Sequence, residues 1–178
     1  MDIRSYIAEN RARFMEEWAS LIRIPSISCQ PSHKADMLRC AERWRELLLE
    51  AGVQHAEVMP SQGNPFVYAE YNPLDVKGKR LEDQGEKIPT VLVYSHYDVM
   101  PVEPLELWNS EPFEPTIRDG RLYARGADDD KGQAMIQVKA FEYLVREGLM
   151  NCRVKFIFEG EEEIGSPSLE AFLEEHRD

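Results

Sequence analysis

The chain has 178 residues, of which 43% are hydrophobic and 30% are charged, so it is long enough for one domain with a buried core. Its 33 acidic side chains outnumber the 21 basic ones, which gives a net charge of −12. This charge argues against nucleic acid as a partner, because Lys and Arg supply most of the affinity for phosphates. No segment approaches the roughly 18 apolar residues of a membrane span, so a membrane partner is not expected either.

The cellular compartment is suggested by the cysteines and by the first residues of the chain. There are 3 cysteines, and so small and odd a number argues against a disulfide framework and favours a reducing compartment. Residues 1–18 carry charges throughout and lack the apolar segment of a secretory signal. We therefore expect a soluble, cytoplasmic protein.

The first half of the chain predicts two helices followed by two short strands. Residues 1–22 place apolar side chains at steps of 3 and 4, the spacing of an amphipathic helix. A second helix is expected over 35–50, with Gly52 as its C-terminal stop. Strands are expected at 57–59 and 66–71, on either side of turn-forming residues.

The second half alternates loops, strands and helices. Residues 72–89 are polar and without periodicity, which indicates an exposed loop, and the apolar run 90–94 is typical of a strand buried on both faces. The remaining elements are expected in this order: a hairpin around Asp119–Gly120, a helix over 131–147, a buried strand over 154–158 and a helix over 166–176. Helices alternating with buried strands predict an α/β layered fold with a largely parallel sheet and flanking helices.

The first candidate site is a His-x-Asp motif that directly follows the predicted strand 90–94. An imidazole is a good zinc ligand, and its second nitrogen is usually held by a carboxylate. Asp98 projects to the same side as His96 if the backbone stays extended. The functional interpretation is therefore His96 as a ligand oriented by Asp98, and a histidine that merely ends a strand is an equally good interpretation of this motif alone.

The second candidate site is the acidic run 128–130 at a predicted junction between a loop and a helix. Three consecutive carboxylates repel one another unless a cation or a helix N-terminus compensates their charge. Capping the helix explains one aspartate but not three with glycines on both sides. The run therefore favours a metal-bridging carboxylate.

The third candidate site is the glutamate run 161–163, between a predicted buried strand and a helix start. A solvated acidic loop is the alternative interpretation. Adjacent glutamates can also divide two tasks, one binding a metal and the other acting as general base on metal-bound water. Together the three sites supply one imidazole and several carboxylates, a donor set that suits zinc, with manganese or cobalt as alternatives.

Taken together, four motifs resemble those of one enzyme family. It is the co-catalytic zinc metallopeptidase family of carnosinase-like dipeptidases, glutamate carboxypeptidase, aminoacylase and succinyl-diaminopimelate desuccinylase. The motifs are SHYDVMPV at 95–102, Trp108 with SEPF at 110–113, DGRLYARGADDDKG at 119–132 and EGEEEIGS at 159–166. The tryptophan with SEPF is most similar to the carnosinase-like dipeptidases.

The resemblance implies a site with two zinc ions. His96 would bind one zinc, Asp98 would orient His96, and Asp129 would bridge both ions. Glu162 would be the general base and Glu163 a metal ligand. A water between the ions would lose its proton to Glu162 and attack the scissile carbonyl, while the zincs stabilise the oxyanion.

Two assignments within the acidic runs depend on register. Reading back from Gly132 puts the bridging aspartate at Asp129, with Asp128 at the variable position before it. The triple glutamate permits a shift of one residue, which leaves Glu161 as a weaker candidate. His176 lies among charged residues and is not assigned as a ligand.

The resemblance also implies that residues 1–178 are the N-terminal part of one catalytic domain. Family members are longer two-domain enzymes, whose remaining metal ligands and lid and dimerisation domain would follow later in the chain. We therefore expect a homodimer for the full-length enzyme and little activity for these residues alone. Such a part should also expose sheet edges that invite self-association. The substrate would be a small peptide or an N-acyl amino acid.

Three other functions are less well supported. A non-catalytic acidic interaction module explains the charge but not the placement of the motifs at strand ends. A magnesium-dependent phosphoryl-transfer enzyme usually carries a Gly-rich phosphate loop with a lysine, and that pattern is absent from the sequence. Catalysis by Cys152 is disfavoured, because this residue is expected to begin a buried strand.

Overall fold

The computed structural model describes residues 1–73 and 88–177. Most of the loop expected at 72–89 thus lies outside the described residues. None of the helices in the described ranges is long and apolar enough to cross a membrane. The main elements in chain order are α1 (Ile3–Ile22), α2 (Lys34–Ala51), β1 (His55–Met59), β2 (Phe66–Tyr71), β3 (Thr90–His96), β4 (Thr116–Arg118), β5 (Arg121–Tyr123), α3 (Lys131–Arg146), β6 (Arg153–Glu159) and α4 (Leu169–Glu175).

The predicted helices and strands are confirmed, and the ends of the helices have local causes. Asp2 begins α1 by accepting the backbone N–H groups of Arg4 and Ser5 at 3.0 and 3.2 Å. Gly52 ends α2 in the left-handed conformation with φ 109°. Helix α4 begins later than expected, because Gly165 and Ser166 have φ of 88° and 51°, which interrupts a right-handed helix.

The sheet is mixed, which corrects the expectation of a largely parallel one. Its strand order is β1-β2-β6-β3, and only the β3–β6 pair is parallel among the described strands of this sheet. Strands β1 and β2 are joined by a short loop, which allows only an antiparallel hairpin. Strands β3 and β6 are connected through α3, the long crossover that a parallel pair requires. The α/β class with flanking helices is confirmed.

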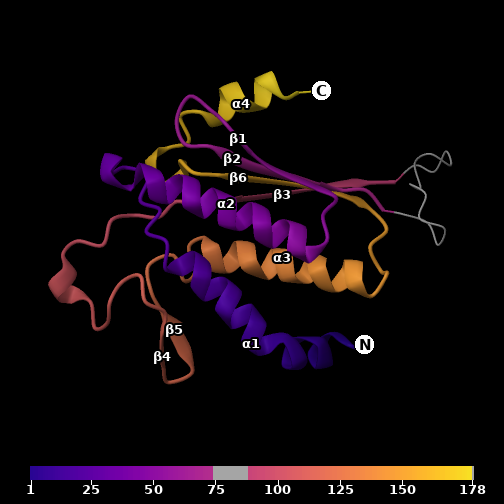
Figure 1. Ribbon diagram of the computed structural model, residues 1–178, viewed down its shortest axis with the longest axis horizontal. Helices are drawn as coiled ribbons and strands as arrows, with labels where there is room; N and C mark the ends of the chain where they lie inside the picture. Colours follow the sequence, from indigo (N-terminus) through magenta and orange to yellow (C-terminus); the bar gives the residue numbers. More distant parts are fainter. Residues whose placement is uncertain (74–87, 178) are drawn as a thin grey trace.

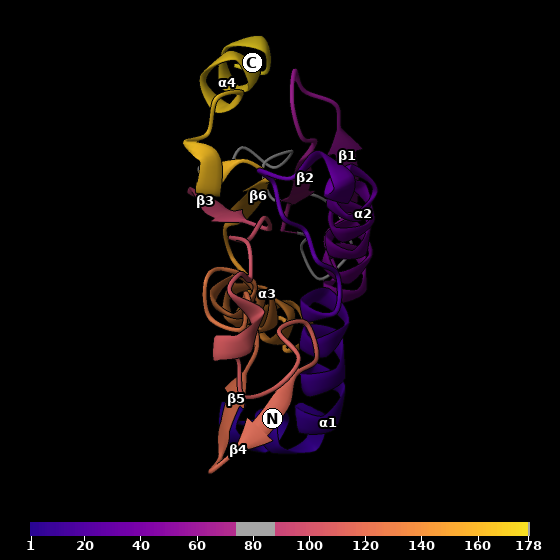
Figure 2. The same cartoon turned by 90° about the vertical axis from the view of Figure 1, so that its left-hand side faces the viewer.

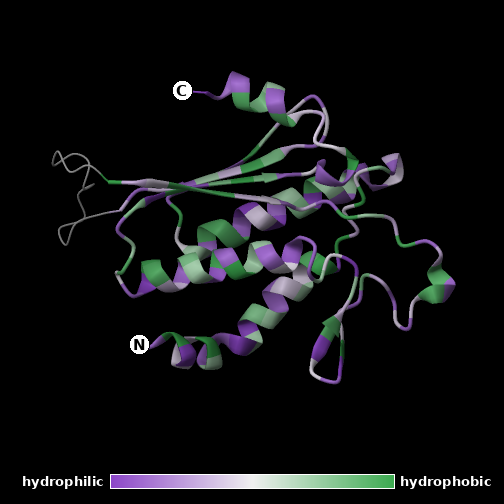
Figure 3. Cartoon of the chain, turned by 180° about the vertical axis from the view of Figure 1, so that it is seen from behind, coloured by the Kyte–Doolittle hydropathy of each residue, from purple (hydrophilic) through white to green (hydrophobic). Residues whose placement is uncertain are grey.

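The helices cover the two faces of the sheet unequally. Helices α1, α2 and α3 lie on one face, with α1 farthest from the sheet, and α4 lies on the other (Figures 1 and 2). Hydrophobic and hydrophilic residues alternate along α1, α2 and α3, as Figure 3 shows, so each helix is amphipathic. The core between α2 and the sheet includes Trp44, whose ring meets that of Phe158 edge-on at 5.0 Å. On the opposite face, Phe172 of α4 stacks on Phe66 at 3.9 Å.

Strand β3 is not buried on both faces, contrary to the sequence-based expectation. Leu92 is 59% exposed, and Val91 and Tyr94 are each 45% exposed. The cause is its position at the edge of the sheet, where β6 pairs with only one of its sides. By contrast, β6 lies between β2 and β3 and is buried as expected, with Phe156 and Phe158 at 0% exposure.

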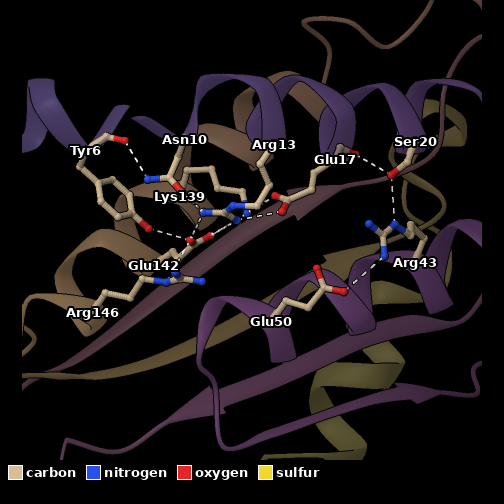
Figure 4. Close-up of polar contacts among 10 residues, drawn as sticks. All are labelled: Tyr6, Asn10, Arg13, Glu17, Ser20, Arg43, Glu50, Lys139, Glu142 and Arg146. Carbon is tan, nitrogen blue, oxygen red and sulfur yellow. Dashed lines mark hydrogen bonds and ion pairs between the residues drawn. The ribbon is translucent and has the colours of Figure 1, made fainter. Parts of the chain in front are cut away.

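Helix α1 is attached to α3 by buried charges (Figure 4). The carboxylate of Glu142 is fully buried and accepts hydrogen bonds from Tyr6 at 2.6 Å and from Lys139 at 2.7 Å. Arg13 binds the same carboxylate and also pairs with Glu17 at 2.8 Å. Burial alone would raise the pKa of Glu142, but the hydrogen bonds from Arg13, Lys139 and Tyr6 lower it to about 2.

Candidate metal centre

The candidate site lies at the carboxyl ends of the two parallel strands, β3 and β6. The register pairs His96 with Glu159, so the residues that follow each strand emerge side by side. The start of α3 reaches the same end of the sheet, on the left in Figure 1. All three motifs of the sequence analysis therefore meet at one place, where ligands of open α/β sheets bind.

His96 is the centre of this group and is 7% exposed. Its Nδ1 lies 3.1 Å from the backbone oxygen of Asp98 and 3.3 Å from the Asp98 carboxylate. Its Nε2 lies 3.1 Å from Oδ1 of Asp129 and 3.7 Å from Oε2 of Glu162. The structure thus brings four of the five predicted site residues into contact through one imidazole ring.

Asp98 is fully buried and holds the glutamate turn in place. Its Oδ1 accepts the backbone N–H of Glu162 at 3.2 Å, and its Oδ2 accepts that of Glu163 at 3.1 Å. These two residues begin the short 3-10 helix η4 (Glu162–Ile164). Asp98 therefore connects the imidazole of His96 to the backbone that carries both glutamates, a second task that the sequence motif did not indicate.

The three aspartates before α3 have separate environments. The side chain of Asp129 is 72% exposed and faces His96, whereas Asp128 lines an apolar cavity between α1 and α3. Asp130 accepts the backbone N–H of His96 at 3.1 Å and the hydroxyl of Ser95. The Asp129–Asp130 peptide bond is cis. The contact of Asp130 with β3 was not predicted from the sequence, although the acidic run that contains this residue was identified there.

The glutamates of the turn also separate. Glu161 is 4% exposed and points to the β1–β2 loop, where its Oε1 accepts the backbone N–H of Asn64 at 3.0 Å. Sequence reasoning left Glu161 open as a candidate for the roles of its neighbours, and its side chain makes no contact with His96. Glu159, which sequence reasoning did not single out, accepts hydrogen bonds from Tyr94 and, at 2.9 Å, from Ser166.

Two of the predicted site residues, His96 and Glu163, have raised pKa values. Burial alone would lower the pKa of His96, but the hydrogen bond with Asp98 and the charges of Asp98, Asp130 and Glu162 raise it to about 9. The pKa of Glu163 is raised by burial and by the negative charge of Asp129. Several carboxylates thus surround one imidazole, and a bound cation would compensate their excess negative charge.

Lys131 does not neutralise this excess, although it directly follows the aspartates. Its side chain is fully buried, and its Nζ donates to the backbone oxygens of Leu21 and Ile24 at 2.9 and 2.8 Å. Within residues 1–73 and 88–177, no three His, Cys, Asp or Glu side chains already form a complete metal-binding group.

Comparison with known proteins supports the resemblance of the motifs. The family model described as Peptidase family M20/M25/M40 matches residues 92–178. A probable di- and tripeptidase, DUG2, from Saccharomyces cerevisiae is 34% identical over 155 residues, which are 86% of this chain and 17% of that protein. A cysteinylglycine-S-conjugate dipeptidase from Corynebacterium striatum is 34% identical over 160 residues, which are 89% of this chain and 32% of that protein.

The fold is also shared with a solved peptidase. The crystal structure of human carnosine dipeptidase 1 matches with a TM-score of 0.81 and 28% identity, over 98% of this chain and 37% of that one. This chain therefore spans between 17% and 37% of the length of these three relatives. From the motifs, the matched residues and the shared fold, we conclude that residues 92–178 match the peptidase M20 family and that the chain as a whole is similar to dipeptidases in sequence and fold.

Proposed function

We propose that this chain supplies part of the active site of a metal-dependent peptidase that hydrolyses the peptide bond of small peptides. The observation that carries the proposal is the imidazole of His96, whose Nε2 lies within 3.7 Å of carboxylates from two separate segments. These groups lie at the carboxyl ends of β3 and β6, within the residues that match the M20 family model.

The types of side chain at the site suit a metal ion, although no three of them in the described residues already form a complete metal-binding group. The Asp129 and Glu162 carboxylates converge on one imidazole nitrogen, and the nearby ammonium of Lys131 is bound elsewhere. His96, Asp129 and Glu163 would hold the metal, and mixed nitrogen and oxygen ligands suit zinc, with manganese or cobalt as alternatives. We propose two ions in the full-length enzyme. A metal bound here polarises the substrate carbonyl and makes water a stronger acid.

The protein's own groups would then move the proton. Glu162 faces His96, and its side chain is 46% exposed, so water can reach this side chain. We propose that Glu162 takes the proton of the attacking water and returns it to the departing amine. Asp98 acts on the ring of His96 at Nδ1, which keeps Nε2 directed at the metal position.

The substrate class follows the family resemblance. We propose a dipeptide or another small peptide, with an N-acyl amino acid as the alternative, because the named relatives are dipeptidases and tripeptidases. We further propose a homodimer for the full-length enzyme and a cytoplasmic location, without nucleic acid or membrane as partner. The net charge of −12 and the free cysteines Cys29, Cys40 and Cys152 support these last two proposals.

Zinc titration by calorimetry tests the proposed centre. We expect binding to the unaltered chain and its loss in the double variant His96→Ala, Asp129→Ala. The matched control is Asp119→Ala, His176→Ala, which removes the same residue types from exposed positions and should leave the heats unchanged. Identical heats in all three proteins would contradict metal binding by His96 and Asp129 and would favour a non-catalytic acidic interaction module.

A further inference from the structure

A small polar cavity lies beside the candidate metal centre, on the side of the turn away from His96. Its volume is about 240 Å³. It is open to solvent and is lined by residues between Ser28 and Met37, by the loop at Gln62–Asn64 and by Glu161. The proposed peptidase mechanism uses none of these side chains.

The carboxylate of Glu161 is only half satisfied. Its Oε1 accepts the N–H of Asn64 at 3.0 Å, but its Oε2 is buried and has no hydrogen-bond partner among the residues that the structure describes. A buried carboxylate oxygen without a donor is costly, so this wall of the cavity favours a group that brings one. Gly63 packs directly on the carboxylate, where a Cβ would meet Oε1 at 1.8 Å. Only a glycine therefore fits beside this carboxylate without displacing it.

Two further polar groups line the same cavity. The hydroxyl oxygen of Ser28 is buried and, within the described ranges, has no hydrogen-bond partner. Lys34 lies at the exposed start of α2, and its ammonium forms no ion pair with any residue in those ranges. Among the described residues, the cavity therefore combines a carboxylate with one oxygen that lacks a donor and a cation that lacks an anion.

We infer that this cavity binds a free α-amino acid. The ammonium group of the ligand would donate to Glu161, and its carboxylate would bind Lys34. Met37 and Ile164 would contact an apolar side chain. The volume is below the roughly 300–1,000 Å³ of pockets for drug-sized ligands, which fits a ligand of this small size.

Such binding would act on the turn that carries the proposed general base. The backbone oxygen of Glu161 accepts the N–H groups of Ile164 and Ser166 at 3.1 and 2.8 Å, so Glu161 closes the turn around Glu162 and Glu163. An amino acid, the class of product that peptide hydrolysis releases, would thus bind next to the site that forms it. The binding itself needs no metal and does not rest on the proposed peptidase function.

Alkylation of Cys29 by iodoacetamide reports on this cavity, because Cys29 lines it and is exposed, whereas Cys40 is buried. The rate is followed by mass spectrometry in the presence of a metal chelator, and the half-buried Cys152 serves as internal reference. We expect L-leucine to slow alkylation of Cys29 and to leave Cys152 unchanged. N-acetyl-L-leucine lacks the ammonium and L-leucinamide lacks the carboxylate, so each should protect about tenfold more weakly or worse.

Two variants locate the contacts. Glu161→Gln and Lys34→Met should each weaken the protection by L-leucine about tenfold. The controls Glu174→Gln and Arg11→Met change exposed charges outside the cavity and should leave protection unaltered. If Glu161→Gln fails to fold, as judged by circular dichroism, Lys34→Met decides. No protection by L-leucine, or equal protection by all three compounds, would overturn the inference and leave a cavity for water only.

Discussion

The imidazole of His96 binds protons more tightly in the folded, metal-free chain than in the unfolded one. Its pKa rises from 6.5 to about 9, because the hydrogen bond and charge of Asp98, with the charges of Asp130 and Glu162, outweigh burial. A raised pKa in the folded state means that the contribution to stability is complete below pH 6.5. It is then lost as the pH rises through about 9.

We therefore expect the free energy of unfolding of the metal-free protein to fall between pH 6.5 and pH 9. The loss should approach about 1.4 kcal/mol for each unit of pKa difference. Urea denaturation measures it, with His96→Gln as the variant in which the slope should flatten. An unchanged slope in that variant would show that other groups cause the pH dependence.

Replacing Asp98 by asparagine removes the charge of this side chain but keeps its size. In Asp98→Asn, an NH₂ group replaces one of the two carboxylate oxygens. This group cannot accept the backbone N–H of Glu162 or Glu163 that it then faces. We expect a loss of about 1–3 kcal/mol in unfolding free energy and a roughly 10–100-fold loss in zinc affinity. The control is Asp119→Asn, at an exposed turn position with φ 50° that Asn tolerates, and it should change neither quantity.

For single residues, the sequence predicted which side chains lie close together but not the direction in which each carboxylate points. His96, Asp98, Asp129 and Glu162 meet because their motifs follow the ends of strands or precede a helix, a placement that periodicity reveals. The direction of Glu161 depends on the β1–β2 loop, whose Asn64 lies far away along the chain. Local sequence contains no information about that neighbour.

Between elements, the buried carboxylate of Glu142 joins α1 to α3 (Figure 4). The variant Glu142→Gln removes the charge that Arg13 and Lys139 neutralise, but both cations keep an ion pair with Glu17. We expect a loss of about 1–3 kcal/mol in unfolding free energy near neutral pH, because the buried hydrogen bonds lose their charged acceptor. The exposed control Glu174→Gln should lose almost nothing.

The lowered pKa of Glu142 also predicts how acid changes the stability that this carboxylate contributes between α1 and α3. The pKa of Glu142 is lowered to about 2, so its contribution is present above the unfolded value of 4.5 and is lost as the pH falls toward 2. The difference in unfolding free energy between the unaltered chain and Glu142→Gln should thus shrink over this interval. A difference that stays constant in acid denaturation curves would contradict the assignment.

The elements themselves were predictable where a pattern repeats. The amphipathic spacing of residues 1–22 and the glycine after 35–50 predicted α1 and α2 almost to the residue. The order of the strands was not predictable, because a run such as 90–94 has the same apolar character at an edge as in the centre of a sheet. Only the pairing of β2 with β6 shows that β3 is left at the edge.

For the molecule as a whole, the exposed edge strand β3 predicts association between copies. Leu92 and Tyr94 are 59% and 45% exposed, and none of the described strands pairs with the outer backbone edge of β3, which can accept another strand. Sedimentation should show concentration-dependent association of this chain, reduced by Leu92→Lys. Leu107→Lys, at a loop residue that is 76% exposed, is the matched control and should leave association unchanged. Equal effects of both variants would point to charge rather than to the strand edge.

The strand order also determines when the pieces come together during synthesis. Strand β2 pairs with β6, with Val67 opposite Phe158, so the first hairpin must wait for a partner that is translated long after it. A two-stranded hairpin is marginally stable in water by itself. The charged groups around His96 come together only after the ribosome has released the glutamates that follow β6. Helices α1 and α2 are therefore available early, whereas the site around His96 and then α4 are the last parts of the described fold to form.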